Sequence, residues 1–318
     1  MHSDRPRSWP HRALVGYAWD MPQTWTGSAP GKLILCGEHA VVHGQPAIAL
    51  AVDRSTTVDL VERPGPSTLD VTPIDDARLW GGLRTLLPAD GFGVRIRTDL
   101  PIGRGMGSSA ALAVALIRAL AQREGRWADL EECTRLGFLM ERVFHGEPSG
   151  IDHTVSACGG ALLYRRAPDG PVWSRLPVPN LPLVVLDSGL AGDTAIQVAA
   201  VRALLPGAAP LLEMIGALVE DIVGLLSEPA PDLGMVGDLL TANHSLLGEL
   251  GVSTPRLDAL VELSLEHGAL GAKLAGAGGG GVVVALVQDP APLLAAALRQ
   301  GVDAWSVGLA PPNPSAAP

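Results

Sequence analysis

Cysteine is scarce in this sequence and does not recur at a metal-binding spacing. Cys36, Cys133 and Cys158 are an odd number and lack a Cys-x-x-Cys pair, which argues against a disulfide framework and against a zinc site of that type. None of the eight histidines belongs to a His-Glu-x-x-His array, so we expect no protein-bound transition metal. Free thiols suit a reducing compartment, and we therefore expect a cytoplasmic protein.

Long apolar runs and clusters of basic residues are also missing. No segment approaches the about 18 consecutive apolar residues of a membrane-spanning helix, so no membrane association is expected. The 23 basic residues are outnumbered by 33 acidic ones, and Lys and Arg nowhere gather into a cluster. Because nucleic acids are bound through such clusters, they are not expected partners. A homodimer stays open.

The two ends of the chain lack the patterns of folded segments. Residues 1–28 mix Arg, His, Pro and Trp without the apolar core of a signal peptide, and we predict a disordered extension with Met21 as the true start. The proline-rich residues 311–318 predict a disordered tail. Between them, the length of 318 residues and 47% apolar composition suit two domains, placed at 29–180 and 181–310.

A glycine-rich stretch, 101–109, is the strongest local signal. Gly103, Gly105 and Gly107 free the backbone for positive φ, and Ser108 or Ser109 could cap the helix that follows to about Arg123. A helix beginning there directs its free N–H groups at the space that the loop encloses, which favours a bound phosphate. The stretch is neither a P-loop nor a dinucleotide fingerprint, so an ordinary strand-to-helix turn is the alternative.

Three ionisable residues stand at the ends of two short apolar strands, 33–36 and 46–52. Burying Lys32, Glu38 and His39 there is costly unless they face a cleft or one another. The alternative to a functional site is a Lys–Glu ion pair beside a histidine with satisfied hydrogen bonds.

Two carboxylates draw attention in the next segment. A helix expected at 127–144 carries Glu141 near its C-terminal end, where the helix dipole disfavours negative charge, so something should compensate it. Asp152 follows a Ser-Gly pair, where the alternative to catalysis is a helix N-cap.

The rest of the chain alternates strand and helix patterns around a second glycine-rich segment, 276–281. That run before an apolar strand costs backbone entropy, which indicates close approach of a ligand or another loop. The expected strands are 56–62, 94–98, 161–164, 171–176, 183–186, 282–287 and 304–307; the expected helices are 75–87, 193–205, 211–226, 233–250, 255–266 and 291–300.

Taken together and in this order, Pro30-Gly31-Lys32 with Gly37-Glu38-His39, the loop 103–109 and the segment 276–281 resemble the three motifs of the GHMP kinase superfamily. The first motif and the turn Pro148-Ser149-Gly150-Ile151-Asp152 most resemble the mevalonate kinase family. The resemblance implies a two-domain α+β GHMP kinase fold, with an N-terminal domain like ribosomal protein S5 domain 2 and a ferredoxin-like C-terminal domain.

The resemblance also implies roles for individual positions. Asp152 would take the proton of the substrate hydroxyl beside Lys32, and Ser109 and Glu141 would hold Mg²⁺, which supplies the compensation for Glu141. Substrate would contact Lys32, Glu38, His39, Asp152, Gly278 and Gly279. The phosphates of ATP would contact Pro101, Gly103, Arg104, Gly105, Met106, Gly107, Ser108 and Ser109.

The implied reaction is the ATP- and magnesium-dependent phosphorylation of a small alcohol, the 5-hydroxyl of mevalonate, in isoprenoid precursor synthesis. Ala275 and Val282 depart from the Thr and Cys of many relatives, and both positions bear on the substrate. Phosphomevalonate or a sugar is therefore an alternative acceptor. A catalytically silent nucleotide-binding paralogue is a further alternative, against which the joint presence of the four catalytic and metal-site positions argues.

Overall fold

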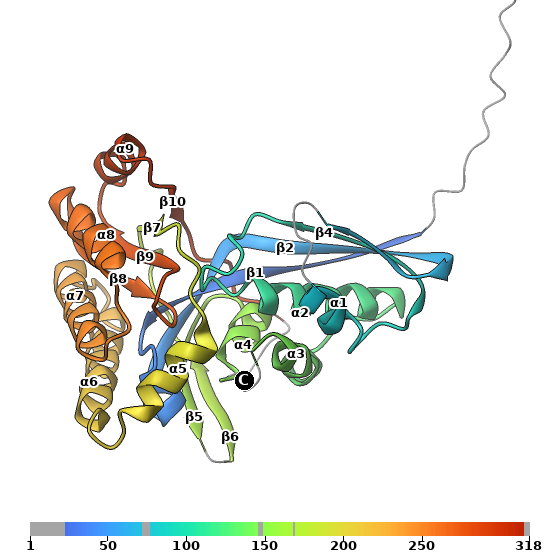
Figure 1. The fold of residues 1–318 in the computed structure, drawn as a ribbon, viewed down its shortest axis with the longest axis horizontal. Helices are drawn as coiled ribbons and strands as arrows, with labels where there is room; N and C mark the ends of the chain where they lie inside the picture. Colours follow the sequence, from blue (N-terminus) through green and yellow to red (C-terminus); the bar gives the residue numbers. More distant parts are fainter. Residues whose placement is uncertain (1–22, 72–76, 146–148, 168, 315–318) are drawn as a thin grey trace, which may run out of the picture.

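The computed structural model describes residues 23–71, 77–145, 149–167 and 169–314 (Figure 1). Its first sheet has six strands in the order β3-β4-β2-β5-β6, with β1 paired antiparallel to β2. The strands are β1 (Thr24–Cys36), β2 (Pro46–Pro66), β3 (Thr68–Val71), β4 (Asp90–Thr98), β5 (Ala161–Ala167) and β6 (Gly170–Arg175), and a 3₁₀ turn, η1 (Ala40–His43), joins β1 to β2.

Helices cover one face of this sheet. They are α1 (Ala77–Leu83), α2 (Ser108–Arg123), α3 (Leu130–His145) and α4 (Ile151–Cys158). In α2 every residue from Ala110 to Ile117 is buried, because its alternating alanines and larger apolar residues fit between the sheet and α3. Leu60, Val94 and Leu116 belong to the core between the sheet and the helices.

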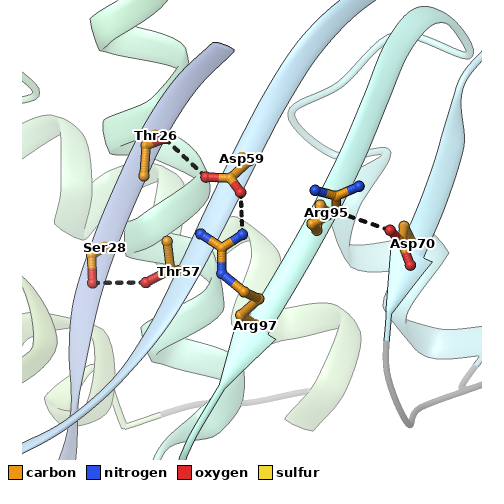
Figure 2. A network of polar contacts seen from close by, with 7 residues as sticks. All are labelled: Thr26, Ser28, Thr57, Asp59, Asp70, Arg95 and Arg97. Carbon is orange, nitrogen blue, oxygen red and sulfur yellow. Dashed lines mark hydrogen bonds and ion pairs between the residues drawn. The ribbon is translucent and has the colours of Figure 1, made fainter.

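Where β1 begins and β2 pairs with β4, the opposite face of the sheet is polar. Figure 2 shows Asp59 of β2 accepting a hydrogen bond from the Thr26 hydroxyl (2.8 Å) and pairing with Arg97 of β4. Arg95 pairs with Asp70 across the parallel β3–β4 ladder. The predicted solvent exposure of the charged face of 94–98 is thus confirmed, since the Arg95 and Arg97 side chains are 61% and 57% exposed.

The second sheet has four strands in the order β10-β7-β9-β8: β7 (Leu183–Asp187), β8 (Ala269–Ala275), β9 (Val282–Val287) and β10 (Ala304–Val307). Its helices are α5 (Thr194–Ala203), α6 (Ala209–Leu226), α7 (Leu233–Glu249), α8 (Pro255–Glu266) and α9 (Ala291–Arg299). Leu33 and Ile48 of the first sheet share a core with Val185 and Val284 of the second. That shared core fixes the two sheets against each other, and the mixed helix and sheet content agrees with the predicted α+β class.

Several expected boundaries were wrong. Residues 24–28 were predicted to be disordered but belong to β1, because they pair with β2 from Thr24 opposite Val61 to Ser28 opposite Thr57. Of the predicted extension, residues 1–22, which include Met21, lie outside the described residues. The helix expected at 75–87 is α1, and part of that range lies outside as well. Strand β8 was not predicted, because its sequence merges into the glycine-rich segment.

The predicted tail is also partly wrong. The backbone N–H of Asn313 donates to the carbonyl of Cys158 at 2.7 Å, and its side-chain amide donates to the carbonyl of Ala157. Residues 311–314 therefore pack beside α4, while 315–318 lie outside the described residues. The predicted division at residue 180 stays a prediction; the strands of the two sheets fall within 24–175 and 183–307. No helix formed by the described residues is both long and apolar enough to cross a membrane.

Candidate active site

The loop 101–107 leads from β4 to the first turn of α2, as the sequence predicted, and with the two serines that open α2 it is called the phosphate loop, 101–109. Gly103, Gly105 and Gly107 have φ of 68°, 80° and 69°. Gly107 is the N-cap of α2, and a Cβ there would lie 2.8 Å from Cγ of Lys32. The loop therefore requires glycine at 107 both for its backbone conformation and for the approach of the lysine.

The predicted serine cap is wrong. Gly107 is the N-cap residue, no side chain caps α2, and Ser108 and Ser109 are its first two helical residues. As in the first turn of any helix, the backbone N–H groups there have no intrahelical carbonyl to bind, and no side chain caps them, so they are directed beyond the helix end. An anion is the ligand that such a helix end suits.

The glycine loop, residues 276–281, lies against the phosphate loop. A Cβ on Gly105 would lie 3.2 Å from the carbonyl oxygen of Ala275, and one on Gly281 would lie 3.0 Å from that of Arg104. The two backbones are thus as close as glycine permits, and the close approach that the sequence predicted for 276–281 is confirmed. The Arg104 side chain itself pairs with Asp187 of β7 at 3.1 Å.

The two loops border a cavity of about 780 Å³. Gly276 and Ala277 line it, whereas Gly278 packs against the carbonyl of Val252 and Gly279 against the side chain of Gln197. Substrate contact by Gly278 and Gly279 stays a prediction, and the glycine-loop residues that face the cavity are the two before them.

Lys32 and Asp152 meet on the cavity wall. Nζ of Lys32 lies 3.2 Å from Oδ1 of Asp152, and the side chains are 5% and 28% exposed. Lys32 follows a register shift in β1 and donates its backbone N–H to the carbonyl of Met106, which ties it to the phosphate loop. Asp152 lies in the first turn of α4, whose N-cap is Gly150, so the alternative of an N-cap aspartate is wrong.

Glu141 of α3 is 1% exposed and lies within electrostatic range of this pair. Burial raises the pKa of its carboxyl to about 8, and the charge of Asp152 adds to that rise. A hydrogen bond with Ser109 and the charge of Lys32 act in the opposite direction. The structure therefore brings together all four of the predicted catalytic and metal-site side chains: Lys32, Ser109, Glu141 and Asp152.

This group suits a magnesium ion. Within the described ranges, no three His, Cys, Asp or Glu side chains gather into a metal-binding cluster. Mg²⁺ needs no such cage, because it keeps several waters and is held by one or two carboxylates together with substrate phosphates. The donor set here is the Ser109 hydroxyl and the buried Glu141 carboxylate. The negative charge of Asp152 disfavours the ionised form of Glu141, and a bound divalent cation would stabilise it.

Glu38 and His39 lie on the same cavity but are held differently. Glu38 pairs with Lys273 of β8 and accepts a hydrogen bond from Asn243 of α7 at 3.3 Å. Nε2 of His39 lies 2.8 Å from the carbonyl oxygen of Ala277. Burial lowers the pKa of His39, although the Ala277 contact and the Glu38 charge oppose this. The alternative of a Lys32–Glu38 ion pair is wrong, since Lys32 pairs with Asp152 and Glu38 with Lys273.

Sequence reasoning missed Lys273 and Asn243. A composition signal could have found the lysine: the chain has two lysines, Lys32 and Lys273, while its other basic residues are arginines. Both lysines are buried beside this cavity. Asn243 carries no comparable signal, because one asparagine in a helix is commonplace.

Beyond the Lys32–Asp152 pair, the lining of the cavity comes from two groups of elements, and apart from His39 the residues named here were not predicted from the sequence. The first group, called the first arm, comes from the first sheet, the phosphate loop and α1–α3, and its residues are Thr56, Leu79, Ile96, Thr98, Ile102, Leu112 and Phe144. The second arm lies between η1 and one face of α5 and is lined by His39, Val42, Ala195, Val198, Ala199 and Arg202.

Comparisons with known proteins show the family to which the chain belongs. Residues 77–160 match the family model for the GHMP kinase N-terminal domain, and residues 214–304 match the GHMP kinase C-terminal model. The chain is 38% identical over 320 residues to the mevalonate kinase of Pyrococcus abyssi, with 88% of this chain and 93% of that protein covered. It is 37% identical to the mevalonate kinase of Thermococcus sibiricus, with 86% and 92% covered.

The fold has a close counterpart among solved structures. The crystal structure of L. major mevalonate kinase in complex with R-mevalonate superposes with a TM-score of 0.80 at 30% identity, covering 93% of this chain and 98% of that one. The predicted GHMP kinase fold is confirmed by these matches. The chain therefore belongs to the GHMP kinase family, and the relatives that it resembles there are mevalonate kinases.

Proposed function

We propose that this chain is an ATP-dependent kinase that phosphorylates the 5-hydroxyl of mevalonate, the step that would place it in isoprenoid precursor synthesis. The observation that carries the proposal is the Lys32–Asp152 pair, 3.2 Å apart on a cavity that the phosphate loop borders. Phosphoryl transfer depends mainly on positioning and on charge neutralisation, and this site offers a carboxylate, a buried ammonium and a helix N-terminus at one point.

In this reaction Asp152 accepts the proton of the substrate alcohol. The alcohol oxygen bonds to the γ-phosphorus of ATP while the bond from that phosphorus to the leaving oxygen of ADP breaks, and the proton of the alcohol passes to the Asp152 carboxylate. The ammonium of Lys32 lies next to the carboxylate and so beside the oxygen on which negative charge develops.

The phosphate loop orients the nucleotide. Backbone N–H groups at the start of α2 would bind its phosphates, and the helix dipole would favour their charge. Ser109 and Glu141 would hold Mg²⁺, which when bound neutralises phosphate charge. Arg104 would act on the nucleotide only by way of its position in the loop, because Asp187 already pairs with it.

The second arm of the cavity favours mevalonate over a sugar. Its walls at Val42, Ala195, Val198 and Ala199 are apolar, which suits the methyl and methylene groups of mevalonate. Arg202 supplies a positive charge for the carboxylate of that substrate. A sugar would leave several hydroxyls against apolar walls without partners.

A cytoplasmic location is part of the same proposal, because the reaction consumes ATP. It is supported by the three cysteines, which are buried free thiols. The homodimer stays a prediction.

A coupled ADP-release assay with mevalonate, phosphomevalonate and galactose as acceptors tests the proposal. We expect turnover with mevalonate. Turnover with only one of the other two would refute the substrate, and ATP binding without turnover on any acceptor would identify a catalytically silent paralogue.

A further inference from the structure

Lys273 is a fully buried cation that does not line the cavity. Its side chain is 0% exposed, and its Nζ donates to the Glu38 carboxylate and to the carbonyl of Leu274 at 2.6 Å. Glu38 is 1% exposed and accepts a second hydrogen bond from Asn243, also buried. Burying two opposite charges costs desolvation energy that their attraction at best repays, so stability alone does not account for the pair.

The use of lysine at this position is selective. Every basic side chain except Lys32 and Lys273 is an arginine. A guanidinium is larger and planar, whereas an ammonium is compact and can donate to a carboxylate and a carbonyl from within a closed space. The contacts of Lys273 are those two acceptors, and its role is therefore specific to Glu38 and the β8 backbone.

Glu38 precedes the most strained residue, His39, of the turn that follows β1. His39 has φ 59° and ψ −47°, and it is the one non-glycine residue with positive φ in the described part of the chain. Such a conformation costs about 1–3 kcal/mol and persists only where neighbouring contacts fix it. Two contacts fix it here, namely the carboxylate of Glu38 on Lys273 and the ring of His39 on the carbonyl of Ala277.

Both contacts come from one continuous segment. Lys273 ends β8 with Leu274 and Ala275, and Ala277 follows in the glycine loop. The Glu38–Lys273 contact holds the turn on the side away from the cavity, because Lys273 does not line the cavity. The His39–Ala277 contact holds the ring that lines the cavity.

We propose that Lys273 is a positioning residue for the acceptor alcohol: through Glu38, and with help from Asn243, it holds the strained turn so that His39 faces the second arm of the cavity. The proposal rests on the proposed function only in requiring that the chain phosphorylates an alcohol. The competing explanation is a structural ion pair without influence on substrate binding.

Four variants separate the two explanations. Lys273→Met leaves Glu38 as an unpaired buried charge and should lose stability as well as activity. Glu38→Gln combined with Lys273→Met removes both charges at similar volume and should fold nearly as well as the wild type. Asn243→Ala removes only the second contact to Glu38. Leu260→Ala is the control, because it opens a cavity in the core between α8 and the second sheet and removes none of the hydrogen bonds of Glu38 and His39.

Steady-state kinetics are measured below the unfolding transition of each variant, with whichever alcohol the wild type phosphorylates. We expect kcat/KM for the alcohol to fall about 100-fold in both Lys273 variants and about tenfold in Asn243→Ala, because small misplacements of a positioning group have effects of that size. The KM for ATP should stay within about twofold, and Leu260→Ala should change neither constant by more than that.

The proposal is overturned if the double variant folds and keeps wild-type kcat/KM for the alcohol, or if the KM for ATP rises in step with that for the alcohol. If neither Lys273 variant folds, Asn243→Ala decides, and wild-type kinetics would overturn the proposal. A readout without turnover is the NMR signal of the His39 ring. It should shift in the folded variants while that of His153 stays, and an unchanged His39 signal would contradict the proposal.

A mutant cycle tests whether Lys273 acts through His39. If it does, adding His39→Ala to the double variant should cost little beyond the loss from His39→Ala alone. If the losses in kcat/KM from His39→Ala and from the double variant multiply when the changes are combined, Lys273 does not act through His39 and the proposal is contradicted. Because the alcohol is the one that the wild type uses, failure of mevalonate as substrate would leave this test intact.

Discussion

The ammonium of Lys32 lies 3.2 Å from Oδ1 of Asp152 and so connects β1 with the first turn of α4. The backbone N–H of Lys32 also donates to the carbonyl of Met106 in the phosphate loop at 2.9 Å. Three segments that are far apart in the sequence therefore meet at one residue, and the chemistry that we propose takes place there.

Asp152→Asn tests the assignment of the base. Asparagine keeps the size of the side chain but cannot accept the alcohol proton, so kcat should fall by about 10²–10⁴. The KM for ATP should change little, since the phosphate loop is untouched. Steady-state assays with each substrate varied in turn measure both constants, and near wild-type turnover would remove Asp152 from the mechanism.

Ser109→Ala and Glu141→Gln test the magnesium site. Each removes one proposed ligand, so the Mg²⁺ concentration for half-maximal activity should rise about tenfold or more at saturating ATP. The comparison variant is Ser108→Ala, whose hydroxyl is not a proposed ligand and whose effect on this concentration should be smaller. Equal effects of the two serine variants would refute the choice of Ser109.

Gly107→Ala tests the close contact between the phosphate loop and Lys32. Gly125→Ala is the matched control, because Gly125 has φ 71° but nothing within 4 Å of an added Cβ. Both changes should cost about 1–2 kcal/mol of unfolding free energy for the left-handed backbone. Only Gly107→Ala should also reduce kcat, because its Cβ displaces the Lys32 side chain. Chemical denaturation and turnover of both variants decide this, and equal activities would count against the contact.

Because His153 is buried, the protein should lose stability in mild acid. Burial lowers the pKa of this histidine to about 4, and the nearby Asp152 charge only partly opposes the shift. In the unfolded state this histidine binds its proton with a pKa near 6.5. The contribution of the neutral His153 to the free energy of unfolding is therefore complete above that pH and disappears as pH falls toward 4. The total is on the order of 3 kcal/mol.

Urea denaturation of the wild type and of His153→Gln at pH 7 and pH 5 measures this contribution. The wild type should lose more unfolding free energy between the two pH values than the variant does. An equal loss in both proteins would show that His153 titrates normally in the folded state.

The parts of the site that local sequence determines were predictable. Glycines at 103, 105 and 107 before an alanine-rich run predict the loop and α2, because positive φ and helix propensity act over a few residues. Most helices of the second half were likewise placed within a few residues of their observed ends, since Pro, Asp and Thr at their starts are local signals.

The parts that depend on distant partners were not predictable from pattern alone. Glu38 could have paired with either lysine, and only the packing of β8 beside the turn selects Lys273. Residues 24–28 look irregular until β2 supplies a partner strand, and Asn313 has no local signal for its bonds to α4. The roles of Asp152 and Glu141 came from a family resemblance, because either could have been an ordinary helix residue.

The central claim concerns which oxygen of which alcohol receives the phosphoryl group. The most direct test is the proton-coupled ³¹P NMR spectrum of the product that the wild-type protein forms from ATP, Mg²⁺ and mevalonate. Transfer to the primary 5-hydroxyl predicts a new phosphomonoester signal split into a triplet by the adjacent CH₂ group. A singlet from the tertiary 3-hydroxyl, or inorganic phosphate as the only new signal besides those of ADP, would contradict the account.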